Sequence, residues 1–301
     1  MIENIKLINT DTKEVIELDT IKTSNLVLES ADLGYVQGVN NSYKYINQIG
    51  EVITNTTVGM REIEIVGWAV GSSIGEMNQT KNFLNRFVNP FQRLDLIYKT
   101  YKLNFVPYSS IQYSNTYEEN NDVICKFKIT GICPYPLFVD NTLSKSTGAT
   151  ITPKFHFPLI ISTVPNPPGG VVFGEKESSL LINIANVGSV PTGMKIIFKA
   201  RTGTVINPKL ININTQEFFK ISKTLSAGEE ITVNTNIGEK SVIGLANGLE
   251  SNYFKYKTFD STWLQLAVGD NFFRYDADSG LEDLEVSIYY GNKYFEVQEW
   301  D

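Results

Sequence analysis

Met60-Arg-Glu-Ile-Glu-Ile-Val-Gly-Trp68 opens the stretch of sequence that decides the fold, which runs on to Phe138. From Glu62 to Ile65 glutamate alternates with isoleucine, and this period of two predicts a β-strand with one dry and one solvated face. Short alternating runs bounded by turn residues recur through most of the remaining chain. We therefore expect a mostly-β protein.

One helix is predicted within this stretch, over residues 76–88. Ser73 and Glu76 have the spacing of a capping box, which marks the start of the helix. Asn89-Pro90 marks its end, because the residue before a proline disfavours the α region. The apolar face recurs at helical spacing and comprises Met77, Thr80, Leu84, Phe87 and Val88.

Three strands are predicted after the helix. Leu94–Tyr98 and Tyr101–Val106 form a hairpin around Lys99-Thr100, and Val123–Ile129 alternates cleanly. Cys133-Pro-Tyr-Pro136 ends the series, since two prolines cannot lie in a central strand.

The only two cysteines are Cys125 and Cys133. On one extended strand their Cα atoms would lie about 26 Å apart at roughly 3.3 Å per residue. A disulfide needs Cα atoms closer than about 7 Å. We therefore expect two free thiols buried on a strand face, with no need for an oxidising compartment.

Size and composition indicate a globular protein. The chain has 301 residues, of which 42% are apolar and 20% are charged, so it can bury one large or two ordinary cores. The net charge is −7 and no basic stretch occurs, so we expect no binding to nucleic acid. No window reaches the roughly 18 apolar residues of a membrane span. Met1–Thr10 lacks an apolar signal-peptide core, so folding in a cytoplasm is expected.

Turn signals divide the chain into a domain over 1–140, a connector over 141–170 and a second domain over 171–301. The connector includes a predicted strand at Phe155–Ile161. In the second domain, turn residues recur roughly every eight to twelve positions, which favours an antiparallel sandwich or barrel. Its predicted strands are Leu180–Ile184, Met194–Ala200, Val205–Ile213, Phe218–Ile221, Glu230–Val233, Trp263–Val268, Asn271–Tyr275 and Leu284–Tyr290.

Catalytic patterns are weak, and we predict no catalytic residue and no cofactor. The single histidine, His156, has no Gly-x-Ser-x-Gly elbow near it, so a structural role is expected. One His and two separated Cys cannot furnish a zinc site. The carboxylate pairs Glu62/Glu64 and Glu282/Glu285 are expected to be solvated faces rather than glycosidase acids.

The tract most like a metal site is Asp276-Ala-Asp-Ser-Gly-Leu-Glu-Asp283. Asp276 and Asp278 could converge on a calcium ion. The tract is too short before its glycine for an EF-hand loop, and it lacks the closing glutamate. We expect a hairpin turn, with a calcium site as the minority alternative.

The order of these pieces resembles the distal tail protein family of long-tailed bacteriophages. In the first half the shared pieces are a strand carrying Arg61, the helix, the Asn89-Pro90 stop, the hairpin and the Cys133–Phe138 close. In the second half the chain is similar to the galectin-like domain of that family. The similar segments there are Ile184–Gly188, Pro191-Thr192, Leu225–Glu229 and Trp263–Leu266 with Gly269 and Asn271.

The resemblance implies scaffolding without chemistry. Proteins of that family assemble as a homohexameric ring that joins the tail tube to the baseplate or tail tip. The implied partners are copies of the chain, the tail tube protein, and baseplate hub and receptor-binding proteins. The implied location is the virion tail, after assembly in the host cytoplasm. The implied fold is an N-terminal β-sandwich or split barrel with one helix, followed by a galectin-like antiparallel β-sandwich.

Residues 33–58 read as a long loop or a protruding hairpin, rich in Gly, Asn and Tyr. Segments of this length in compact domains are usually functional. We expect Gly34–Val58 to cross a subunit boundary in such a ring. The residues expected at the oligomer interface are Tyr35, Val39, Tyr43, Tyr45 and Ile49.

A galectin-like sandwich also allows an alternative function, as a carbohydrate-binding or host-adhesion module. Trp263 is the candidate for stacking on a sugar ring. Its neighbours Thr262, Leu264 and Gln265 are not the His, Asn, Arg and Glu that surround such a tryptophan in sugar-binding galectins. We therefore expect Trp263 to lie in the core.

Overall fold

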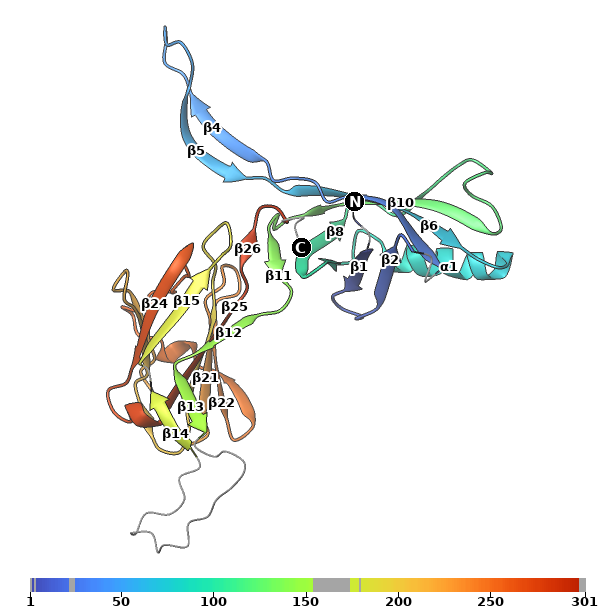
Figure 1. The fold of residues 1–301 in the computed structure, drawn as a ribbon. Helices are drawn as coiled ribbons and strands as arrows, with labels where there is room; N and C mark the ends of the chain where they lie inside the picture. The colour runs from blue at the N-terminus through green and yellow to red at the C-terminus, as the bar shows by residue number, and fades with distance from the viewer. Residues whose placement is uncertain (1, 3, 22–24, 154–173, 179, 298–301) are drawn as a thin grey trace, which may run out of the picture. The chain divides into compact units, whose positions relative to one another are not determined.

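The computed structural model describes residues 2, 4–21, 25–153, 174–178 and 180–297. The chain divides into two compact units, shown in Figure 1. The N-terminal unit comprises Met1–Thr142 together with Lys293–Asp301, and the C-terminal unit comprises Leu143–Asn292. The expected strand at Phe155–Ile161, and His156 within it, lie outside the described residues.

This division differs from the expected one at both ends of the second domain. Residues 144–153, expected in the connector, form two strands that belong to the C-terminal unit. The segment from Lys293 onward, expected in the second domain, belongs to the N-terminal unit. Sequence periodicity cannot reveal this return, because a strand has the same pattern whichever unit it joins.

The N-terminal unit is built on a closed ring of paired strands. The ring closes where Gly131 and Ile132 pair antiparallel with Pro107 and Val106. All neighbouring pairs are antiparallel except one, a parallel contact at Asp19 and Val27. In spatial order the strands are β8 (Tyr101–Pro107), β7 (Leu94–Tyr98), β1 (Asn4–Asn9), β2 (Val15–Asp19), β3 (Leu26–Asp32), β6 (Arg61–Val70) and β10 (Ile124–Cys133).

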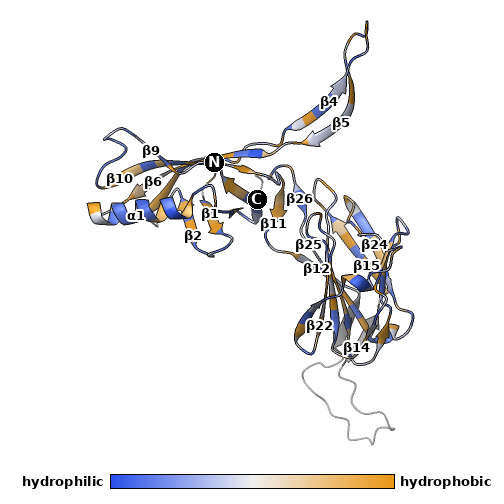
Figure 2. Ribbon diagram, turned by 180° about the vertical axis from the view of Figure 1, so that it is seen from behind, coloured by the Kyte–Doolittle hydropathy of each residue, from blue (hydrophilic) through white to orange (hydrophobic). Residues whose placement is uncertain are grey.

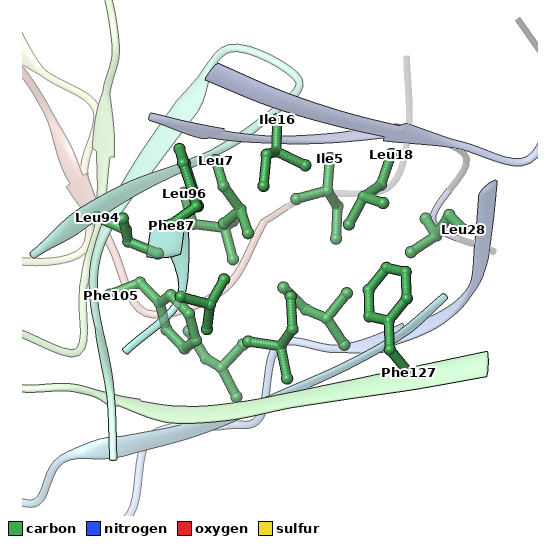
Figure 3. Close-up of a cluster of buried hydrophobic side chains, with 14 of the residues drawn as sticks. Ile5, Leu7, Ile16, Leu18, Leu28, Phe87, Leu94, Leu96, Phe105 and Phe127 are labelled. Carbon is green, nitrogen blue, oxygen red and sulfur yellow. The ribbon is translucent and has the colours of Figure 1, made fainter. Parts of the chain in front are cut away.

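Alternation along these strands fills the barrel. Every second residue from Arg61 to Ala69 is buried, and so is every second residue from Cys125 to Ile129. The predicted strands of this region are present, including the hairpin around Lys99-Thr100. Figure 3 shows that the side chains converge on one cluster, which includes Ile5, Leu7, Ile16, Leu18, Leu28, Phe87, Leu94, Leu96, Phe105 and Phe127.

The predicted helix is α1 (Ile74–Phe87), which lies against the barrel (Figure 1). It begins two residues before the expected start, and it ends before Asn89-Pro90. The Ser73 hydroxyl accepts the Glu76 N–H at 3.3 Å, as a capping box requires. The Glu76 carboxylate accepts the N–H of Ser72 rather than that of Ser73. The Ser72 hydroxyl also donates to this carboxylate, and the two hydrogen bonds from Ser72 lower the pKa of Glu76. The buried helix residues are Met77, Leu84 and Phe87.

The chain leaves and re-enters the N-terminal unit at adjacent strands. β11 (Phe138–Asp140) pairs with β8, and β26 (Lys293–Tyr294) pairs with β11, so that Phe138 lies opposite Tyr294. Tyr101 packs edge-on against both rings, at centroid distances of 6.2 and 5.4 Å. The C-terminal unit is therefore an insertion into the N-terminal unit.

Two antiparallel sheets form the C-terminal unit and enclose a single apolar core. The antiparallel sandwich expected for this half of the chain is confirmed. The larger sheet comprises β12 (Ser144–Thr147), β25 (Leu284–Tyr290), β16 (Lys195–Ala200), β21 (Glu230–Asn234), β22 (Ser241–Ala246) and β23 (Leu249–Asn252). The smaller comprises β15 (Leu181–Asn186), β24 (Gly269–Asp276), β18 (Lys209–Asn212) and β19 (Phe218–Lys220).

Shorter elements complete the C-terminal unit. Two pairs of short strands stand apart from the main sheets, and two single turns of 3₁₀ helix lie in its loops. They are β13 (Ala149–Pro153) with β14 (Gly174–Ser178), β17 (Val205–Ile206) with β20 (Thr224–Leu225), η1 (Phe254–Tyr256) and η2 (Leu281–Asp283). In the N-terminal unit, the two-residue strand β9 (Gln112–Tyr113) pairs with β10.

Two strand predictions in this unit are wrong. Val205–Ile213 is not one strand but β17 and β18, because Asn207 adopts a left-handed φ of 52° and Pro208 follows it. Trp263–Val268 forms no strand; its one ladder contact is the bridge between Thr192 and Leu266. Strands β22 and β23 were not predicted, since their short apolar runs carry little alternation.

The segment around Leu266 is held by buried asparagines instead of a strand ladder. The Asn271 amide donates to the carbonyls of Ala267 at 2.8 Å and Gly269 at 2.9 Å, and it accepts the Ala267 N–H at 2.9 Å. The Asn186 amide donates to the Leu266 carbonyl at 3.1 Å. The motif residues Asn186, Thr192, Leu266 and Asn271 are therefore joined by one network of hydrogen bonds.

We predict that Asn271→Ala destabilises the C-terminal unit by about 2–3 kcal/mol, because the backbone groups of Ala267 and Gly269 would lose their hydrogen-bond partner. Denaturant unfolding measures the change. Asn183→Ala, on the solvated face of β15, is the control and should change stability by less than about 0.5 kcal/mol. Equal effects of the two substitutions would contradict the structural role of Asn271.

Both cysteines lie buried on β10 as free thiols, as predicted. Burial raises the pKa of Cys133 to about 11. The folded protein therefore holds this proton more tightly than the unfolded chain, whose thiol titrates near its ordinary value.

We predict that Cys133 makes stability fall between about pH 9 and pH 11, by up to about 2–3 kcal/mol. Its contribution is fully present below the unfolded pKa and is lost as pH rises through the folded one. Cys133→Ala removes this titration while other groups still titrate. The measurement is the difference between the two proteins' unfolding free energies across that window. A constant difference would refute the prediction.

Candidate functional site

A long hairpin leaves the barrel between β3 and β6, and it is the most unusual surface of the molecule (Figure 1). Its arms are β4 (Gly38–Tyr43) and β5 (Val52–Val58), which pair antiparallel with an irregularity between Asn41 and Ser42. Every residue of both arms is exposed. The segment expected to be a loop or protruding hairpin is thus a hairpin without a core.

Polar side chains tie the two arms together. The Thr56 hydroxyl donates to the Asn40 side-chain oxygen at 2.7 Å, and the Thr54 hydroxyl donates to the Asn41 carbonyl at 2.9 Å. Tyr43 and Tyr45 pack edge to face with centroids 4.9 Å apart. Such contacts fix the pairing but bury little apolar surface, and a two-stranded hairpin is marginally stable alone in water.

Apolar residues occur at several positions along this exposed hairpin, as the hydropathy colours of the ribbon in Figure 2 show. The residues expected at the interface, Tyr35, Val39, Tyr43, Tyr45 and Ile49, are all exposed, and Ile49 is completely so. The expected set leaves out four further exposed apolar residues of the hairpin, although each is an apolar residue in a polar segment. These are Ile46, which is 95% exposed, and Val52, Ile53 and Val58.

The base of the hairpin is fixed by Gly34 and Arg61. Gly34 has a φ of 62°, and a Cβ atom there would lie 2.2 Å from the Glu62 carbonyl oxygen. Its own carbonyl accepts from the Arg61 guanidinium at 2.8 Å. The N–H of Gly59 donates to the Gln37 carbonyl at 2.9 Å, which closes the base. The first and last residues of the arm are therefore held to the barrel.

Arg61 is completely buried, and its guanidinium also contacts backbone and side-chain groups besides Gly34. It donates to the carbonyls of Leu33 at 3.2 Å and Pro136 at 3.0 Å, and also to the carbonyl of Phe295. It lies 3.4 Å from a Glu296 carboxylate oxygen and 4.7 Å from the centroid of the Phe138 ring. One side chain thus joins the hairpin base, the end of β10 and the returning chain.

The candidate calcium residues lie in the C-terminal unit among cationic side chains. The Lys220 ammonium group is 2.9 Å from Asp278, and the Lys209 ammonium group is 3.8 Å from Asp276. Hydrogen bonds from Asn207 and Lys220 lower the pKa of Asp278. Lysines therefore occupy the space that a bound cation would need. No cluster of three acidic, His or Cys side chains is present among the described residues.

The candidate carboxylate pairs lie on the surface. Glu62 is exposed, and Glu64 forms an ion pair with Lys128 at 2.7 Å. Glu282 is exposed, and Glu285 lies 3.7 Å from Arg201. None of these pairs stands in an enclosed site. In the described part of the chain, no helix is long and apolar enough to cross a membrane.

Trp263 is half-buried rather than fully buried. Its ring packs against Phe219 and Phe254, with centroids 5.2 and 5.9 Å away. The ammonium groups of Lys240 and Lys257 lie 5.6 and 5.9 Å from its centroid. Phe219 and Phe254 cover part of the ring and two cations lie beside the rest, so the geometry does not favour stacking on a neutral sugar.

Comparison with known proteins finds phage tail components that are similar to this chain. Residues 187–294 match the family model SPP1_Dit, the C-terminal domain of siphovirus-type tail components. No curated protein sequence matches the chain.

Solved structures share the fold of the whole chain. The crystal structure of the SPP1 Dit protein (gp 19.1) matches with a TM-score of 0.63 and 10% identity. That protein is described as a paradigm of the hub adsorption apparatus in phages that infect Gram-positive hosts. The match covers 96% of this chain and 98% of that one. A chain of the phage P2 baseplate, in its activated conformation with Ca, matches with a TM-score of 0.56 and 14% identity over 99% of this chain and 100% of that one. The resemblance to the distal tail protein family, and the predicted fold, are confirmed.

We predict that Arg61→Lys destabilises the N-terminal unit by about 3 kcal/mol or more, because an ammonium group cannot reach the acceptors that the guanidinium binds. Denaturant unfolding is followed by fluorescence in a Trp263→Phe, Trp300→Phe background, in which Trp68 alone reports on this unit. Arg86→Lys is the matched control, since Arg86 forms an exposed ion pair with Glu14 and should change stability by less than about 1 kcal/mol. A similar effect of both variants would refute the central role of Arg61.

Proposed function

We propose that this protein is a structural hub of a phage tail tip, in which copies of the chain form a homohexameric ring. The ring would join the tail tube to baseplate or receptor-binding proteins. The proposal has no catalytic step, and the surfaces described above provide contacts rather than an enclosed reaction site. The family match and the shared fold of hub and baseplate chains support the class of function.

The exposed hairpin β4–β5 is the observation that carries the proposal. It extends from the barrel with no buried residue in either arm, yet it displays several large apolar side chains. Exposed strands of this kind are a liability in a monomer, because they invite pairing and aggregation. A neighbouring copy that covers the hairpin removes this liability.

A ring follows naturally from one arm that reaches a different surface on the next copy. Contacts of this head-to-tail kind close into a ring when the rotation between copies allows it. The rigid base supplied by Arg61 and Gly34 fixes the direction of the arm from the barrel. A fixed direction favours one closed assembly over a range of open chains.

The C-terminal unit is proposed to bind other tail proteins. It is inserted between β11 and β26 and has its own core, so it can present surfaces without interrupting the barrel. The implied location is the virion tail, following assembly in the host cytoplasm. The remaining partners proposed are the tail tube protein and the baseplate proteins named by the resemblance.

We predict that replacing Val39–Thr56 with an Asn-Gly turn leaves a folded monomer and abolishes the ring. Gly38 and Val58 are paired at the hairpin base. The inserted Asn-Gly and the retained Thr57 make a three-residue connection between them, a length that is common in β-hairpins. Light scattering combined with negative-stain microscopy measures assembly against the 33.8 kDa mass of one chain. A full ring formed by the shortened protein would rule out the role of the hairpin.

A point variant tests the same surface with the hairpin still present. Ile46→Asp with Ile49→Asp should weaken assembly at least about tenfold, because it buries charges at an apolar contact. Ile237→Asp with Val187→Asp is the control, as both residues are exposed in the C-terminal unit. Equal losses in the two double variants would point to a general effect of charge.

A further inference from the structure

A cluster of lysine and aromatic side chains lies on the C-terminal unit around Trp263. The lysine ammonium groups lie within cation–π distance of the rings, which is about 6 Å. Two of these groups approach Trp263, and the Lys255 group lies 5.0 Å from the centroid of Tyr256. The lysine–aromatic cluster comprises Lys240, Phe254, Lys255, Tyr256, Lys257 and Trp263.

The aromatic rings of the cluster are anchored from below. Phe219 is completely buried and packs on Trp263. Tyr253 packs edge to face on Tyr256, with centroids 5.2 Å apart. Phe254 is 50% exposed, and it packs on Trp263 as well. The rings therefore form a fixed, partly exposed apolar surface whose ordering costs little on binding.

The positive charges of the cluster are not neutralised within the described chain. Lys240, Lys255 and Lys257 form no salt bridge there, whereas the nearby Lys220 and Lys223 are paired with Asp278 and Glu229. The chain as a whole carries a net charge of −7. Three unpaired lysines on fixed aromatic rings are thus a local exception to the charge of the molecule.

We propose that the lysine–aromatic cluster is a docking surface for an acidic segment of another protein. Carboxylates of the partner would lie beside the three ammonium groups, and charge complementarity of this kind steers association and fixes register. Apolar side chains of the partner would pack on Phe254 and Trp263, since aromatic anchors dominate the energetics of interfaces. The site belongs to the C-terminal unit and does not depend on ring formation.

The neighbouring strand favours an extended partner. β23 is the last strand of its sheet in the described residues, and all four of its residues are exposed. η1, which supplies Phe254 and Tyr256, follows it directly. An extended segment can add to such an edge through main-chain hydrogen bonds. Its alternate side chains would then be free to reach the cluster.

The test is fluorescence anisotropy with the full-length protein and a labelled peptide of about twelve residues in which Glu alternates with Leu. We expect saturable binding at low ionic strength, where charge contacts are least screened. Substituting Lys240, Lys255 and Lys257 together by Glu should weaken binding at least about tenfold. These side chains are not buried, so the variant is expected to fold, and circular dichroism verifies this.

The control triple variant substitutes Lys13, Lys99 and Lys145 by Glu, which makes the same change in net charge at other exposed lysines. Equal weakening in both triple variants would overturn the proposal, because binding would then follow net charge alone. Absence of binding would also overturn it. Tight binding of polygalacturonate that depends on the cluster, without binding of the peptide, would also overturn the proposal. That result would assign the surface to an acidic saccharide.

Discussion

The buried guanidinium of Arg61 is the interaction on which the N-terminal unit depends. A charge in a protein interior is costly unless hydrogen bonds satisfy it. Arg61 meets this condition by joining backbone carbonyls from Leu33, Gly34, Pro136 and Phe295. Three segments far apart in sequence, at residues 33–34, 136 and 295, must therefore be in place together, and loss of any one leaves part of the guanidinium without a hydrogen-bond acceptor.

The hydrogen bonds of Arg61 also explain how the exposed hairpin keeps a fixed direction from the barrel. Its arms bury nothing, so nothing within the arms fixes their direction. The direction comes from the base, where Gly34 accepts from Arg61 and closely approaches the Glu62 carbonyl. The hairpin thus keeps its apolar residues exposed, while Arg61 at its root is completely buried.

Local features of the fold could be predicted from sequence because they depend on neighbouring residues. The Ser73 cap, the proline after Asn89 and the alternation from Arg61 onward each act within a few positions. Features decided by distant contacts could not be predicted. The segment after Trp263 has the alternation of a strand but is held by Asn186 and Asn271. The exposed residue Ile46 gave no signal beyond being apolar among polar neighbours. The lysine–aromatic cluster forms only where separate loops meet.

Because the chain returns to the N-terminal unit only at β26, the last contacts of Arg61 form at the end of synthesis. Arg61 is made early, whereas Phe295 and Glu296, which complete its shell of acceptors, follow more than two hundred positions later. A growing chain on the ribosome can form most of the barrel. Until the last residues are made, the Arg61 guanidinium at the root of the hairpin lacks the acceptors of Phe295 and Glu296. The insertion has time to fold by itself in that interval. The guanidinium of Arg61 gains its last acceptors only once residues 293–297 have left the ribosome, so the root of the hairpin is completed at the end of synthesis.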